Sequence, residues 1–300
     1  MKKIKLFILL VCMAATVVSC NEDELDANSI FDTTPPVRNE FDNWIMDHYV
    51  GPFNIDLKYR FEDVESDVDY NVTPAIYENS VALARLVQHL WMEAYTEVAD
   101  TTFLATYCPK LMHFVGSPEY EKTSGSMVLG AAEGGLKITL FNVNGMNLSL
   151  QESDPDAFVK ELNQWYFVTM HHEFAHILHQ TKNYSTDFNE ITEGAYTGQA
   201  WVNKSDTEMR KLGFVSAYGS SEVNEDFVET IAHYVVKSED EWNALLEEAG
   251  PVGAPLIEQK LEFVTNYLAE SWNIDIKELH EVVQRRQKEV PSLDLDYLNK

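Results

Sequence analysis

The 300-residue sequence predicts an α+β protein, because strand-like and helix-like patterns occupy different parts of the chain. Short runs with alternating or continuous apolar residues, typical of β-strands, are confined to the first half. Runs with apolar residues three and four positions apart, typical of amphipathic helices, dominate the second half. We therefore expect an N-terminal mixed sheet followed by a mainly helical C-terminal lobe.

The N-terminal segment has the organisation of an export signal. Three lysines precede the apolar run Leu6–Val18, which is too short to span a bilayer as a helix. The run ends at Val17-Val18-Ser19-Cys20, which resembles a bacterial lipobox, whose cysteine is lipidated and becomes the N-terminus after cleavage. We expect residues 1–19 to be a lipoprotein signal peptide and Cys20 to carry the lipid, with an ordinary secretory signal as the alternative.

Residues 20–40 are expected to form an acidic tether. Four acidic residues follow Cys20 within six positions, and the segment is poor in residues that build a core. An acidic stretch at this place resembles the surface-export signal of Bacteroidetes-type lipoproteins, which implies an outer-membrane lipoprotein at the cell surface. A solvated linker without a targeting role is the alternative. Residues 41–300 remain for the folded domain.

In five segments that precede the central helix, the spacing of apolar residues is typical of a strand or of a helix. Residues 54–61 alternate polar and apolar side chains, which predicts a strand with one buried face. The stretch from Pro74 to about Ala99 has helical spacing. Further strands are expected at Leu111–Val115, Ser126–Ala132 and Leu136–Val143, the last two joined by a turn at residues 133–135.

The next helix carries the most informative residues. Its start is marked by Ser153-Asp154-Pro155, a capping residue followed by proline in the first turn. Apolar residues keep a helical period from Phe158 to about Gln180, either as one long helix or as two short ones. Within this segment lies His172-Glu173-Phe174-Ala175-His176, an HExxH motif.

The motif has the residue types and the spacing of a zinc site. Two histidines four positions apart lie on the same face of a helix, so His172 and His176 can bind one Zn²⁺. Glu173 would then stand beside a zinc-activated water as general base, an arrangement that hydrolyses peptide bonds without a covalent intermediate. Because a catalytic zinc takes three protein ligands, a third ligand is expected elsewhere in the chain.

The second half predicts a helical lobe. Four segments have apolar spacing of three and four, at Glu222–Val236, Glu239–Ala249, Ala254–Trp272 and Asp275–Val290. Breaks are expected at Gly250-Pro251 and at Asn273. We place the boundary between an N-terminal lobe, about residues 50–182, and a C-terminal lobe, about residues 183–300, after the motif helix.

This order of elements resembles the zincin metallopeptidases. In that fold an edge strand above the active-site helix holds an extended substrate by backbone hydrogen bonds. The resemblance places this strand within Ser126–Ala132 or Leu136–Phe141, and an ordinary hairpin is the alternative. One zincin branch, the metzincins, extends the motif to HExxHxxGxxH, but His179 and Lys182 stand at its glycine and last histidine positions. We expect His171 and His179 to pack around the site or to support its ligands.

A downstream segment supplies a candidate for the third ligand. Residues 218–229 resemble the lethal-factor-like metallopeptidases, in which a tyrosine precedes the glutamate ligand by seven residues. Carried onto this chain, the resemblance makes Glu225 the third ligand and Tyr218 the group that stabilises the transition state. The neighbouring acidic residues Glu222, Asp226 and Glu229 remain alternatives, and Glu229 would also suit a role in supporting a ligand histidine.

As a whole, the chain is similar to zinc-binding metallopeptidase lipoproteins associated with TonB-dependent substrate import. This resemblance implies a zinc metallopeptidase that acts on a peptide or protein, is anchored in the outer membrane by lipid and is linked to nutrient uptake through an importer. The alternative is a non-catalytic zincin-fold lipoprotein that binds a nutrient polymer or an importer. The presence of Glu173 favours the enzyme, because a binding module needs no general base.

Charge and cysteine content argue against a nucleic-acid-binding protein and against a fold held by disulfides or by a cysteine-based zinc site. Loss of residues 1–19 would remove three lysines and no acidic residue, so the formal charge would go from −27 to −30. Such a surface repels nucleic acid and anionic membranes, so no nucleic-acid partner is expected. Of three cysteines, only Cys108 would remain unmodified, which leaves no intramolecular disulfide and no cysteine-based zinc site.

Overall fold

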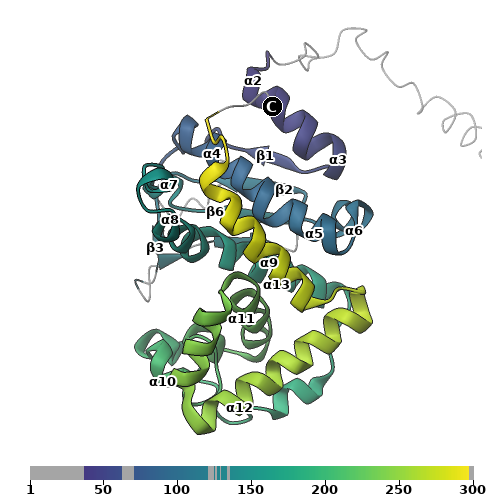
Figure 1. Ribbon diagram of the computed structural model, residues 1–300, viewed down its shortest axis with the longest axis vertical. Coiled ribbons are helices and arrows are strands. Elements are labelled where there is room, and N and C mark those ends of the chain that lie inside the picture. The colour runs from purple at the N-terminus through teal and green to yellow at the C-terminus, as the bar shows by residue number, and fades with distance from the viewer. Residues whose placement is uncertain are drawn as a thin grey trace, which may run out of the picture. The chain divides into compact units, whose positions relative to one another are not determined.

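The computed structural model describes residues 37–62, 71–120, 125, 127–128, 130–133 and 136–296 (Figure 1). The expected signal peptide, Cys20 and most of the expected tether lie outside the described residues. Residues 39–300 form one unit, in which a small sheet and several helices share a single large core. The predicted α+β class is confirmed. The proposed division into lobes at residue 182 stays a prediction.

The first described element is a helix that sequence periodicity did not reveal. It begins at a capping box, in which the Asn39 side chain accepts a hydrogen bond from the Asp42 backbone and the Asp42 carboxylate accepts one from the Asn39 backbone. The helical run ends at Asn54, which has a positive φ of 55°. Its three parts are α2 (Glu40–Ile45), the π-helical η1 (Met46–Val50) and α3 (Gly51–Phe53).

The larger sheet has four short strands in the order β1-β2-β6-β5. Strands β1 and β2 are parallel, as are β2 and β6, whereas β5 runs antiparallel to β6 and lies at the edge. The register places Leu57 opposite Met112, and Met112 opposite Ile138, so the central strands bring apolar side chains into the core. The strands are β1 (Asp56–Lys58), β2 (Leu111–Phe114), β5 (Gly130–Glu133) and β6 (Lys137–Leu140).

Two strand predictions need correction in their extent. The strand expected over residues 54–61 is only three residues long. The strand expected at Ser126–Ala132 is divided between two sheets, because β4 (Met127–Val128) pairs with β3 (Glu119–Tyr120) while β5 pairs with β6. A sequence period cannot reveal such a division, since both parts have strand-like residues.

Helices cover the sheet and build most of the core. The predicted helix near residues 74–99 is present as a continuous helical run with a π-helical turn in it, and its buried side chains include Leu83, Leu90 and Trp91. A short helix follows, which periodicity also missed. The elements are α4 (Tyr77–Val87), η3 (Gln88–Met92), α5 (Glu93–Val98) and α6 (Thr101–Tyr107).

The motif helix begins where the sequence indicates. Asp154 caps it by accepting a hydrogen bond from Ala157 N, and Pro155 occupies the first turn. The run is helical throughout, so it is one long helix, and a π-helical turn separates its two α-helical parts. It comprises α8 (Pro155–Leu162), η5 (Asn163–Phe167) and α9 (Val168–Thr181), after the short η4 (Val143–Gly145) and α7 (Leu150–Ser153).

The remainder of the described chain is helical, as expected. The predicted break at Gly250 is a kink, where φ is 68°, and the break at Asn273 is a left-handed helix end with a φ of 55°. Helix α11 lies beside α9, α12 and α13 (Figure 1). The elements are η6 (Thr186–Glu190), η7 (Gly198–Asn203), α10 (Asp206–Arg210), η8 (Tyr218–Ser220), α11 (Val223–Val236), α12 (Glu239–Trp272), α13 (Ile276–Glu289) and η9 (Val290–Ser292).

Aromatic packing fixes α11 against the motif helix and the segment after it. Phe227 is fully buried and stacks on Tyr184, with ring centroids 4.0 Å apart. The side of α11 that carries Glu225 is thereby held next to α9. Among the described helices, none has the length and the hydropathy needed to cross a bilayer.

Candidate metal centre

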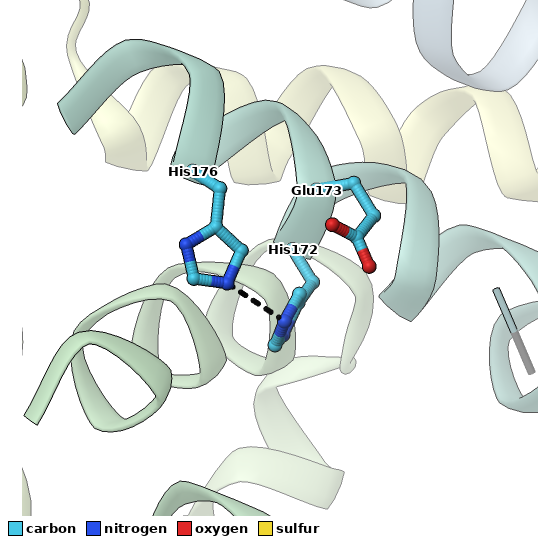
Figure 2. A group of neighbouring side chains, drawn as sticks. All are labelled: His172, Glu173 and His176. Carbon is cyan, nitrogen blue, oxygen red and sulfur yellow. Dashed lines mark hydrogen bonds between the residues drawn. The ribbon is translucent and has the colours of Figure 1, made fainter. Parts of the chain in front are cut away.

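Two histidines of α9 face each other one helical turn apart (Figure 2). His172 Nε2 and His176 Nε2 lie 3.2 Å apart, and both rings are largely withdrawn from solvent. Glu173 belongs to the same group: one ligand atom from each of the three residues lies within 4.8 Å of the others. The structure thus brings together the three motif residues that the sequence singled out.

Glu225, in the first turn of α11, completes this arrangement. Its Oε2 atom lies 3.1 Å from His172 Nε2 and 3.4 Å from His176 Nε2. The packing of α11 along α9 brings this carboxylate to histidines that precede it by about fifty residues in the chain. The structure thus brings Glu225, which the resemblance to the lethal-factor-like metallopeptidases made a candidate ligand, next to both histidines.

The three atoms are arranged as ligands of one zinc ion would be. Ligands at about 2.0–2.1 Å from a tetrahedral zinc lie roughly 3.3 Å from one another, and the observed separations are 3.1, 3.2 and 3.4 Å. Among the described residues, Glu225 Oε2 is buried and has no hydrogen bond of regular geometry. Two imidazole nitrogens and one carboxylate oxygen are also a donor set that zinc prefers. The residues present therefore fit zinc.

The electrostatics of the group favour a positive charge between these side chains. Burial lowers the pKa of His172, but the adjacent Glu225 and Glu229 carboxylates outweigh this and raise it to about 10. Burial raises the pKa of Glu225, but the two imidazoles outweigh this and lower it to about 2. A cation at this place, whether a proton or a metal ion, is stabilised by carboxylates that stay ionised.

Glu229, one turn after Glu225, contacts the far side of the first histidine. Its Oε1 lies 2.8 Å from His172 Nδ1, and its Oε2 accepts a hydrogen bond from the Ser216 hydroxyl and lies 3.2 Å from His233 Nε2. Burial raises the pKa of Glu229, but His233 and His172 outweigh this and hold it well below the ordinary value. An ionised Glu229 holds a proton of His172 on Nδ1, so Nε2 is the nitrogen that would exchange its proton for a metal ion.

The second histidine is supported by another imidazole. His176 Nδ1 lies 2.9 Å from His179 Nε2, and burial lowers the pKa of His179 to about 4, so this ring is neutral at pH 7 and can accept a hydrogen bond. His171 lies elsewhere: its Nδ1 is 3.0 Å from the Tyr95 hydroxyl. The two extra histidines of the motif helix thus differ, since only His179 contacts a candidate ligand.

Glu173 and Tyr218 lie beside the candidate ligands. Burial raises the pKa of Glu173, as suits a general base. The Tyr218 ring centroid is 5.8 Å from that of His172, and burial and the nearby Glu225 carboxylate raise the pKa of Tyr218 above its ordinary value. Tyr218 therefore stays protonated near neutrality and can donate a hydrogen bond.

The other acidic candidates have different positions. Asp226 forms a fully buried ion pair with Lys260, 2.6 Å long, and it also accepts a hydrogen bond from the Tyr196 hydroxyl. Glu222 is the residue at the N-cap of α11. Of the four candidates, only Glu225 and Glu229 contact described histidines of the motif.

Sequence reasoning missed three supporting residues. Lys260 lies between Ile257 and Val264 on the apolar stripe of α12. A lysine in an apolar stripe indicates a buried charge, so the sequence contained a signal for this residue. His233 follows Glu229 by four residues on one helix, a spacing that predicts contact. Ser216 lies in a loop, and nothing in the sequence indicated its hydrogen bond to Glu229.

Comparison with known proteins gives two matches. The profile of a family described as "Putative zinc-binding metallo-peptidase" matches residues 34–277. A crystal structure described as a "putative zinc-binding metallo-peptidase" from Bacteroides caccae ATCC 43185 is similar over 90% of this chain and 100% of that chain, with 42% sequence identity and a TM-score of 0.75. No curated protein matches the chain.

Proposed function

The chain belongs to the family described as "Putative zinc-binding metallo-peptidase", and from this premise we propose that it hydrolyses peptide bonds at a zinc ion held by His172, His176 and Glu225. The family and the related crystal structure point to zinc as the metal. The proposed ligands rest on one observation: Glu225 Oε2 lies 3.1 Å from His172 Nε2 and 3.4 Å from His176 Nε2.

The chemistry divides between the metal and the side chains around it. When bound there, zinc would polarise a water molecule and the carbonyl group of the substrate. Glu173 would accept the proton of the attacking water and deliver it to the leaving amine. Tyr218 would donate a hydrogen bond to the oxygen on which negative charge develops. Glu229 and His179 would hold the two imidazoles in the orientation that binding requires.

Strand β5 supports the proposal of an extended peptide substrate. Among the described strands it pairs with β6 alone, and it contacts α9, the helix of the motif. A peptide that adds to the open edge would form backbone hydrogen bonds beside the metal centre. We therefore propose β5 for the edge-strand role.

Two variants test the catalytic roles. Glu173→Gln should retain zinc and lose hydrolysis of a mixed peptide library by roughly 10²–10⁴-fold, because only the general base is removed. Tyr218→Phe should retain zinc and lower kcat by roughly 10²–10³-fold. Full activity of Glu173→Gln would reject the mechanism, and loss of zinc from Tyr218→Phe would make Tyr218 a structural residue or a ligand.

We further propose that the enzyme is anchored through Cys20 at the outer membrane and serves nutrient uptake beside a TonB-dependent importer. The lipobox-like segment and the acidic stretch after it support this proposal. Cys20→Ala should abolish labelling with palmitate and release the protein from the membrane fraction. Equal labelling of both proteins would contradict it. The non-catalytic alternative, which binds a nutrient polymer or the importer, predicts no hydrolysis by the zinc-loaded protein.

A further inference from the structure

An uncharged segment is fixed against the part of the chain that carries Tyr218. Thr197 donates its backbone N–H to Ser220 O at 2.7 Å, and the two side-chain hydroxyls lie 2.9 Å apart. These contacts hold the start of η7 against η8. The ring of Trp201, in η7, then meets the ring of Tyr218 edge to face, with centroids 5.0 Å apart and planes at 73°.

The aromatic side chains form a path outward from the metal centre. The His172 ring lies 5.8 Å from the Tyr218 ring, which in turn lies 5.0 Å from the Trp201 ring. Tyr218 is 38% exposed, Val202 is 38% exposed, and Trp201 is only partly buried. Apolar surface is thus accessible to a molecule that occupies the metal centre.

The chemistry of this surface is selective. The ten residues from Gly194 to Asn203 include no charged side chain, although the whole chain has a formal charge of −27. The segment therefore provides no carboxylate to pair with a lysine or arginine of a substrate. Removal of a large apolar side chain from water against the indole ring is the favourable interaction that it provides.

We propose that Trp201 and Val202 form a subsite that binds a large apolar side chain of the substrate next to the scissile bond. This inference rests on the proposed function, because Tyr218 would contact the carbonyl group of that bond. A side chain adjacent to the carbonyl would then reach the partly exposed Trp201 ring, whose centroid lies 5.0 Å from that of the Tyr218 ring. Substrates with phenylalanine, leucine or a residue of similar size at this position are the preferred class.

The test uses inhibitors that bind zinc, so that it does not depend on turnover. Three N-acetylated amino-acid hydroxamates, of phenylalanine, glycine and lysine, are titrated into the zinc-loaded protein by calorimetry. The phenylalanine compound should bind about five- to tenfold more tightly than the glycine compound. Trp201→Ala should remove this difference by weakening the phenylalanine compound more than the glycine compound, and Trp201→Phe should restore most of it.

Tyr77→Ala is the matched control, because Tyr77 is an aromatic residue 40% exposed that contacts Phe41 and Tyr59 rather than Tyr218. It should keep the full preference for the phenylalanine compound. An unchanged preference in Trp201→Ala, or tightest binding of the lysine compound, would overturn the inference and leave the zinc site intact. Failure of the glycine compound to bind would instead reject the proposed zinc site, and the subsite with it.

Discussion

His172 and His176 differ in the group that supports each ring. A carboxylate, Glu229, contacts Nδ1 of His172, whereas a neutral imidazole, His179, contacts Nδ1 of His176. Carboxylates and backbone carbonyls are the usual partners of zinc-bound histidines, so the imidazole is the less common choice. Because a carboxylate makes a histidine more basic than an imidazole does, the two ligands are expected to contribute unequally to the affinity for zinc.

Removal of the imidazole partner tests this role of His179. His179→Leu should weaken zinc binding roughly 10- to 100-fold, because His176 loses the acceptor that orients it. The measurement is competition for zinc against a chelator of known affinity. His171→Leu is the control: His171 is equally part of the motif helix, but it contacts Tyr95 rather than a ligand. Equal affinities in wild type and His179→Leu would show that His179 only packs.

At the level of single residues, the sequence singled out four side chains that the structure brings together. His172, Glu173 and His176 are identified by a fixed local spacing, and such a pattern survives folding because a helix preserves it. Glu225 depended on a resemblance, since its approach to α9 comes from tertiary packing. Ser216 and the Lys260–Asp226 pair could not be predicted by spacing, because each contact joins segments that are far apart in the chain or irregular.

Helix α11 is the element that connects the metal centre to the rest of the fold. Its acidic residues contact two different helices. Glu225 and Glu229 contact the histidines of α9, whereas Asp226 contacts Lys260 of α12. Lys260 Nζ also donates to Gly213 O at 2.7 Å and lies 4.0 Å from the Phe214 ring centroid. The ion pair therefore fixes α11 between two other parts of the chain.

Breaking this ion pair should be costly. Lys260→Met leaves the Asp226 carboxylate buried without its cationic partner, and the free energy of unfolding should fall by about 3–5 kcal/mol. Urea denaturation of the metal-free protein measures the change. The double variant Lys260→Met, Asp226→Asn should lose less than the single variant, because no unpaired charge remains. A single-variant cost near zero would mean that the pair contributes nothing to the position of α11.

Helices in which apolar residues recur at regular spacing were predicted well. Elements that depend on a capping box or on strand pairing were not. The helices near residues 74–99 and 155–180 and those of the second half have long apolar stripes, which makes them recognisable. The helix at Glu40 starts through a capping box and is only six residues long before its π-helical turn. Strand β5 takes its identity from its partner β6, and pairing is a property of the fold rather than of a short segment.

On the scale of the whole molecule, one core supports both the sheet and the metal centre. Buried residues from β2, β6, α4, α9, α11 and α13 belong to the same cluster, so the helix of the motif is held by residues from most of the chain. The proposed zinc site needs such support, because its three candidate ligand atoms come from two helices and lie within about 3.4 Å of each other. The sequence predicted the α+β class but not the common core.

The central claim, that His172, His176 and Glu225 hold zinc, is tested most directly by metal content. Purified residues 21–300 are measured by inductively coupled plasma mass spectrometry beside Glu225→Gln, with Glu222→Gln as a control that alters a neighbouring carboxylate. We predict about one zinc per chain in wild type and in Glu222→Gln, and a strong loss in Glu225→Gln. Full zinc occupancy in Glu225→Gln would contradict the assignment of Glu225, and absence of zinc from all three proteins after zinc is supplied would contradict the site itself.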